Sequence, residues 1–187
     1  MSKLALPSLS GIGNITLLLV INLVLTLAFM DQFYNHDLPC PLCILQRMGF
    51  TLIGLMFLLN IRSGAHSSHY GFAILFCVLG LSVSLRQVLL HVAPGDLGYG
   101  DTFFRIHFYT WAFVGFVSLL VSIGVLLIIP DQGTRSRHWF AQFVCLWFVL
   151  LLIGNLISTL SVCGLGACAD NPQSYQGINQ LRQWLLK

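Results

Sequence analysis

Charged residues are scarce in this sequence. Of its 187 residues only 8% are charged and 57% are hydrophobic, whereas a soluble globular domain carries about 25% charged residues. This scarcity excludes an ordinary soluble domain and indicates an integral membrane protein. The sequence also lacks a basic run, and its net charge is only +3, so no nucleic-acid partner is expected. The length suits one domain, and residues 1–187 are predicted to form a single membrane domain.

Further absences narrow the class of membrane protein. The first apolar stretch is not followed by an A-x-A-like cleavage site, which favours a retained helix over a removed signal peptide. Charges at the centres of the apolar stretches and paired broken stretches are both missing, which argues against a transporter. Five stretches are long enough to span a bilayer, which takes about 20 residues. They cover residues 13–30, 41–61, 70–92, 106–129 and 138–162.

An odd number of spans places the two ends of the chain on opposite sides of the membrane. The loop after the first span, the loop after the third span and the C-terminal tail then share one side. Two close cysteine pairs, Cys40/Cys43 and Cys163/Cys168, lie in these segments. The sequence therefore predicts an all-α membrane protein with an antiparallel four-helix bundle, a fifth transmembrane helix and both cysteine pairs on one side.

Basic residues favour one orientation of the predicted spans. The residues Lys3, Arg62, Arg135 and Arg137 flank the spans on the side opposite the cysteine pairs, which favours a cytoplasmic N-terminus. Persistent disulfides belong outside the cytosol. Both criteria predict that the cysteine pairs and the C-terminus face a periplasm-like space.

The tail after Cys168 has the pattern of a short amphipathic helix. Asn171 is a candidate cap, and Pro172 would occupy the first helical position. The apolar residues Ile178, Leu181 and Leu185 recur at helical spacing. We expect this helix to lie on the outer membrane surface, in contact with lipid. The alternative is a frayed terminus.

The segment 40-CPLCILQR-47 combines a cysteine pair with an arginine at the start of a span. Pro41 suits the first turn of a helix, so Cys40 is predicted to cap it. The positive end of a helix dipole favours the thiolate that disulfide exchange requires. Arg47 lies one turn beyond Cys43, on the same face, where a charge in the membrane indicates a functional site. The alternative is an inert pair beside an arginine that extends to the lipid headgroups.

The segment 39-PCPLCILQR-47 resembles the first-loop signature of the DsbB disulfide bond formation proteins, and 85-LRQVLLH-91 is also similar to that family. The resemblance implies a quinone-coupled oxidase in the bacterial inner membrane that reoxidises a periplasmic, thioredoxin-like (DsbA-like) dithiol carrier. It implies that Cys43 contacts the ubiquinone or menaquinone and that Arg47 helps to bind it. It also implies that Cys40 exchanges with a second, more mobile cysteine pair.

The chain departs from the family where that second pair is expected. The loop 91-HVAPGDLGYGDTFFR-105 contains no cysteine, whereas 163-CGLGAC-168 follows the fifth span. We expect Cys163 and Cys168 to replace the missing loop pair, with Cys168 facing the carrier and Cys163 facing Cys40. The four catalytic residues would then be Cys40, Cys43, Cys163 and Cys168. The alternative is a static structural disulfide.

Polar residues elsewhere in the spans provide further candidates. Arg86 and His91 are predicted to bind quinone, although both also suit the membrane edge. Asn14, Asn22, Asn60 and Asn155 indicate helix ends or interhelical hydrogen bonds.

Two other functions remain compatible with the sequence. One is a vitamin K epoxide reductase-like enzyme, although that pattern usually places its Cys-x-x-Cys later in the chain. The other is a non-enzymatic membrane protein in which the four paired cysteines bind zinc or form static bridges. A metal site is not part of the preferred prediction.

Overall fold

All five predicted apolar stretches are helical in the computed structural model, which describes residues 9–34, 38–96, 98–100, 102–129 and 138–186. Within these residues five helices are long and apolar enough to cross a membrane, which confirms the predicted all-α membrane fold. The first helix is longer than predicted, beginning at Leu9 rather than residue 13 and ending at Tyr34 rather than residue 30. The five helices are α1 (Leu9–Tyr34), α2 (Pro41–Ser63), α3 (Ser67–Leu90), α4 (Phe108–Ile128) and α5 (Trp139–Cys163).

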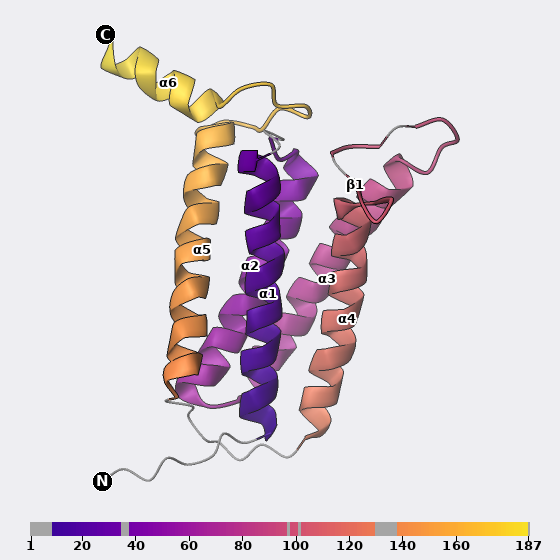
Figure 1. Cartoon of the computed structure of the whole chain (residues 1–187), viewed down its shortest axis with the longest axis vertical. Helices are drawn as coiled ribbons and strands as arrows, with labels where there is room; N and C mark the ends of the chain where they lie inside the picture. The colour runs from indigo at the N-terminus through magenta and orange to yellow at the C-terminus, as the bar shows by residue number, and fades with distance from the viewer. Residues whose placement is uncertain (1–8, 35–37, 97, 101, 130–137, 187) are drawn as a thin grey trace.

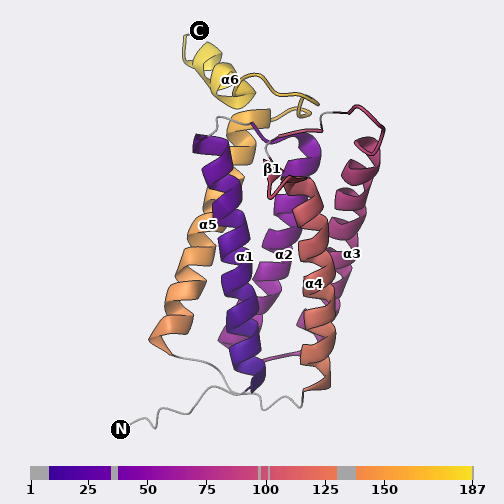
Figure 2. The same cartoon turned by 45° about the vertical axis from the view of Figure 1, so that its right-hand side comes forward.

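Consecutive spanning helices run in opposite directions, and α1 to α4 form the predicted bundle (Figures 1 and 2). The fifth helix, α5, packs against α1 and α2, on the side away from α3 (Figure 1). The C-terminal tail and the loop between α3 and α4 lie at the same end of the bundle in both views. This end contains the beginning of α2 and the end of α5, so it brings the two cysteine-containing segments together.

Glycines on α2 and α3 allow neighbouring helices to approach closely. A side chain at Gly49 or Gly80 would meet the ring of Phe116, which packs from α4 between α2 and α3. A side chain at Gly54 would meet the ring of Phe148, a fully buried residue of α5. Small residues in membrane helices commonly serve such close packing. Through these contacts α4 and α5 pack directly against α2, and both helices therefore lie beside the site at the beginning of α2.

Buried amide side chains tie the helices together. The Nδ2 atom of Asn14 donates to the Tyr70 hydroxyl at 2.6 Å, and Asn60 Nδ2 donates to Asn14 Oδ1 at 3.0 Å. These bonds join α1, α2 and α3 near the end of the bundle opposite the cysteines. Asn22 Nδ2 donates to the carbonyl oxygen of Val144 at 3.0 Å and so joins α1 to α5. The predicted interhelical hydrogen bonds are confirmed for Asn14, Asn22 and Asn60.

A short hairpin precedes α4. Its strands β1 (Thr102–Phe103) and β2 (Ile106–His107) pair antiparallel, and Phe104 and Arg105 adopt positive φ values of 51° and 64° in the turn. This hairpin is not predictable from the sequence, because two residues per strand give no alternation of apolar and polar positions to detect.

The predicted tail helix exists as α6 (Gln176–Leu185), but its predicted start is wrong. Tyr175, rather than Asn171, precedes the helix, and Pro172 lies outside it. In its first turn α6 packs closely on the end of α5, because Gly177 lies against Gly164 and the carbonyl oxygen of Leu160. The apolar side chains of α6 are exposed, as a helix lying on a membrane surface requires, and that placement stays a prediction.

Candidate active site

Cys40 and Cys43 form a disulfide at the beginning of α2. Pro41 is the first helical residue and Cys40 is the N-cap, as predicted. The Cys40 sulfur accepts a hydrogen bond from the backbone N–H of Cys43 at 3.1 Å. The free N–H groups and the dipole of a helix start both favour negative charge. The helix therefore stabilises the thiolate of Cys40 when the disulfide is opened.

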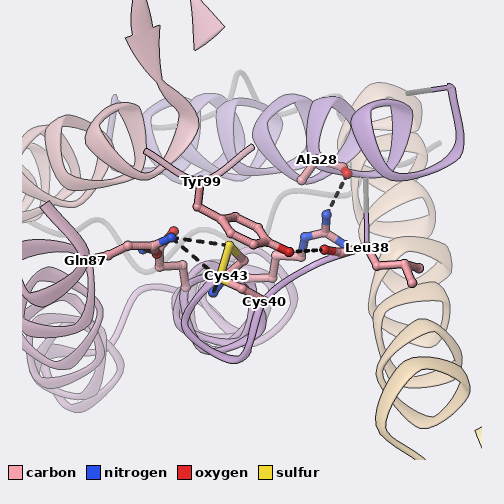
Figure 3. Close-up of a disulfide and its surroundings, with 8 residues drawn as sticks. Ala28, Leu38, Cys40, Cys43, Gln87 and Tyr99 are labelled. Atoms are coloured by element: carbon pink, nitrogen blue, oxygen red, sulfur yellow. Dashed lines mark hydrogen bonds between the residues drawn. A yellow bond between two sulfur atoms is a disulfide. The ribbon is translucent and has the colours of Figure 1, made fainter. Parts of the chain in front are cut away.

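A buried glutamine from α3 faces both sulfurs of this pair (Figure 3). Gln87 Nε2 lies 3.5 Å from the Cys40 sulfur and 3.6 Å from the Cys43 sulfur. Gln46 Nε2 donates to Gln87 Oε1 at 2.8 Å. Both glutamines are buried, with 1% of Gln87 and 6% of Gln46 exposed. Neither glutamine is among the site residues predicted from the sequence.

Arg47 points toward α1 rather than outward to lipid headgroups. Its guanidinium donates to Gln32 Oε1 and to the carbonyl oxygen of Ala28, each at 2.7 Å, and lies 5.7 Å from the centre of the Phe29 ring. Ser158 of α5 donates to the same Gln32 oxygen at 3.0 Å. Arg47 therefore lies one turn below the cysteines, as predicted, and hydrogen bonds from α1 and α5 hold it there through Gln32. Gln32 is not among the residues predicted from the sequence.

A largely apolar cavity of about 330 Å³ lies beside the disulfide. Cys43 and Arg47 line it from α2, Asp31 lines it from α1, and Tyr109 lines it from α4. Tyr99, from the loop between α3 and α4, also lines it and donates its hydroxyl to the Leu38 carbonyl oxygen at 2.7 Å (Figure 3). A guanidinium has five N–H donors, and the bonds to α1 use two of them. The cavity therefore suits an apolar ring that carries carbonyl groups.

The second cysteine pair lies close to the first. Cys163 is the last residue of α5 and is disulfide-bonded to Cys168. Cys163 and Val162 form a buried cluster with Ile44, against which Leu38, Cys168 and Tyr175 pack. Because Ile44 directly follows Cys43 and Leu38 lies two residues before Cys40, the prediction that both pairs lie on one side of the bundle is confirmed. Cys163 is buried, whereas Cys168 is half-buried and more accessible.

The structure does not bring Arg86 to the cavity. Its side chain is exposed on α3, and it is not among the described residues that line the cavity. His91 follows α3, and its ring lies 5.5 Å from that of Tyr109, a cavity residue. The roles predicted for Arg86 and His91 in quinone binding stay predictions, and the geometry favours His91.

His91 is held by the loop between α3 and α4. Its Nδ1 lies 3.1 Å from Asp96 Oδ1, and the backbone N–H of Gly98 donates to the same oxygen at 2.7 Å. The Gly98 hydrogen bond, followed by the one with His91, holds the pKa of Asp96 below its ordinary value. Asp96 therefore stays ionised at neutral pH and keeps the His91 ring beside Tyr109.

In the described part of the chain, no group of three or more His, Cys, Asp or Glu residues has the arrangement of a metal site. The four cysteines that zinc would require are instead joined as two disulfides.

Comparison with known proteins identifies the family. The family described as disulfide bond formation protein DsbB matches residues 12–99. The disulfide bond formation protein B of Chromobacterium violaceum is 36% identical over 142 residues, which is 68% of this chain and 83% of that protein. The protein of the same name from Nitrosomonas eutropha is 41% identical over 63 residues, which is 32% of this chain and 39% of that protein. The one from Azoarcus sp. is 37% identical over 70 residues, which is 35% of this chain and 42% of that protein. No solved structure gives a significant match. The chain belongs to the DsbB family, membrane thiol oxidoreductases involved in disulfide bond formation.

Proposed function

We propose that this protein oxidises the dithiol of a thioredoxin-like (DsbA-like) carrier and passes the electrons to quinone in the bacterial inner membrane. One observation carries the proposal. The Cys40–Cys43 disulfide lies next to both the Cys163–Cys168 pair and an apolar cavity that is lined by Cys43 and Arg47. A disulfide that adjoins both a second disulfide and a cavity is the arrangement that a relay of electron pairs needs.

The first steps are two thiol–disulfide exchanges. A carrier thiolate attacks Cys168, the more accessible sulfur, and the Cys163–Cys168 bond breaks. The second carrier thiol then displaces Cys168, so the carrier leaves oxidised and the tail pair is reduced. Cys163 next attacks Cys40, and the electron pair of the Cys40–Cys43 bond stays on Cys43. When Cys168 displaces Cys40, the tail disulfide is restored and Cys40 and Cys43 hold both electrons.

The residues around the cavity fit a quinone. Its walls are largely apolar, and the fork of N–H donors on Arg47 suits a carbonyl oxygen. Cys43 lines the cavity, and Cys40 is not among its described lining residues, so Cys43 is the sulfur that would meet the ligand. A bound quinone would accept the two electrons and two protons of the Cys40/Cys43 dithiol and leave as quinol, and the disulfide would form again.

Membrane orientation follows from the same scheme. Both cysteine pairs would face the periplasm, where the carrier acts, with the N-terminus in the cytoplasm and α6 on the outer lipid surface. Arg62, at the other end of α2, supports this orientation. Lys3, Arg135 and Arg137 lie outside the described residues and support it by sequence alone.

Arg47 is expected to set the affinity for quinone. The Arg47→Lys variant keeps the charge but loses the fork that binds Gln32 and the Ala28 carbonyl together. We expect its KM for quinone to rise roughly tenfold, the equivalent of one lost charged hydrogen bond. Arg62→Lys, at the opposite end of α2, is the matched control and should leave the KM unchanged. An unchanged KM in Arg47→Lys would mean that the fork does not contribute to binding.

Thiol trapping in membranes tests the proposal against static or zinc-binding cysteines. Cells are grown with and without quinone synthesis, free thiols are alkylated, and the redox state of each cysteine pair is determined by mass spectrometry. We expect both pairs to be oxidised when quinone is present and reduced when it is withdrawn. Pairs that stay oxidised in both conditions would mean structural disulfides and would refute the proposal.

A further inference from the structure

Gln87, the buried glutamine of α3, is placed to take part in the reaction, and neither the cysteine motif nor the family match gives it a role. We propose that Gln87 is a catalytic residue: its carboxamide donates hydrogen bonds to the sulfur that becomes a thiolate when the Cys40–Cys43 disulfide opens. Gln46 is the positioning residue that holds this carboxamide in the donating orientation. The inference rests on the proposed function for its purpose, but its test does not depend on quinone or carrier.

Orientation of the carboxamide is fixed by its partner. Gln46 Nε2 donates to Gln87 Oε1 at 2.8 Å, so the oxygen of Gln87 is directed at Gln46 and its nitrogen at the sulfurs. In the reversed orientation two NH₂ groups would face each other, and the carbonyl oxygen would face the sulfurs. With 1% of Gln87 and 6% of Gln46 exposed, little water can replace these bonds. The pair therefore presents a fixed donor to the disulfide.

The Gln87 carboxamide has enough N–H groups, at a suitable distance, to donate to either sulfur. A carboxamide nitrogen carries two hydrogens, and Gln87 Nε2 lies almost equally far from the two sulfurs, at 3.5 and 3.6 Å. A neutral disulfide is a weak acceptor, whereas a thiolate forms a charge-assisted hydrogen bond about twice as strong. The contact is therefore worth more once an S–S bond has broken than before, which is the requirement for catalysis.

The two sulfurs do not depend equally on Gln87. The Cys40 sulfur also accepts the backbone N–H of Cys43 at 3.1 Å. In the proposed exchange, Cys163 attacks Cys40, a new S–S bond forms, the old one breaks, and the electron pair stays on Cys43. The nearby cation, Arg47, directs its guanidinium to Gln32 and Ala28 on α1. Gln87 is thus the donor placed to stabilise the charge that appears on Cys43.

The reactivity of the cysteines tests this role directly. The full-length protein carrying Cys163→Ser and Cys168→Ser is reduced, and alkylation of Cys40 and Cys43 by iodoacetamide is followed by peptide mass spectrometry across pH. Gln87→Met keeps the length and burial of the side chain but removes the N–H donors. We expect its alkylation rate at pH 7 to fall roughly tenfold and the midpoint of the rate–pH curve to move up by about one unit.

Two companion variants separate chemistry from folding. Gln46→Met leaves the Gln87 donors in place but unlocks their orientation, so we expect a smaller fall in rate, in the same direction. Ser84→Ala lies one turn earlier on α3 and removes a buried hydroxyl that bonds to the Gly80 carbonyl oxygen. It should leave the curve unchanged. If Gln87→Met does not fold, the rate–pH curve of Gln46→Met tests the inference instead. A curve that coincides with that of Ser84→Ala would then overturn it.

The outcomes are distinct from those of the proposed function. A rate–pH curve in Gln87→Met that coincides with that of Ser84→Ala would overturn the inference, even if the protein reduces quinone. A shifted curve would support the inference, even if the unaltered protein fails to reduce quinone and the proposed function is wrong.

Discussion

Replacing Cys43 with alanine is expected to reduce quinol formation to the rate seen without protein. Cys43 is the cysteine of the first pair that lines the cavity, and it is the sulfur on which the electron pair is left in the proposed exchange. Without it, Cys40 is a lone thiol, so there is no disulfide for Cys163 to attack and no dithiol that could pass two electrons to quinone. The measurement is quinone absorbance in the presence of purified protein and a reduced thioredoxin-like carrier.

The same assay has matched controls within the chain. Cys77 on α3 and Cys145 on α5 are free, buried and part of the main hydrophobic core, away from the disulfides. Cys77→Ala and Cys145→Ala should leave the rate of quinol formation unchanged, because each removes one sulfur from packing only. Retained activity in Cys43→Ala would contradict the role of this disulfide as the electron donor to quinone.

Replacing Cys163 with serine is expected to abolish turnover with the protein carrier but to preserve turnover with a small dithiol. Cys163 is buried at the end of α5 and shares a cluster with Ile44 and Leu38, which flank the first pair. A protein carrier would need the tail pair to deliver its electrons inward. Dithiothreitol is small enough to fit the cavity beside Cys43, so we expect it to reduce the first disulfide directly, without the tail pair.

The comparison is made in one protein preparation, with quinol formation measured for each reductant in turn. Cys168→Ser should behave like Cys163→Ser, because either change destroys the second disulfide. Equal loss with both reductants would indicate general damage to the bundle. Turnover with the protein carrier at the unaltered rate would contradict the relay and favour a structural disulfide in the tail.

The features that could be predicted from the sequence are those set by composition and local spacing. Runs of apolar residues define the five spanning helices, and Pro41 after Cys40 defines the start of α2. The odd number of spans is enough to put both cysteine pairs at one end, where the cluster around Ile44 confirms them. The family match then separates this chain from the vitamin K epoxide reductase-like alternative.

The parts of the site that could not be predicted depend on contacts between distant segments. Gln87 is 41 residues from Gln46, and Ser158 is 126 residues from Gln32. In sequence, a glutamine near the end of an apolar span is typical of the membrane edge, and nothing local indicates which neighbour it faces. Only the packing of α1, α3 and α5 around the start of α2 brings Gln87 to the two sulfurs and Gln32 to Arg47.

The most direct test of the central claim is anaerobic quinol formation by the purified protein. The protein is mixed with a short-chain ubiquinone or menaquinone and a reduced thioredoxin-like carrier, and quinol and carrier disulfide are counted together. The account predicts one quinol for each carrier dithiol oxidised. Carrier oxidation without quinol, or no reaction with either quinone, would contradict it.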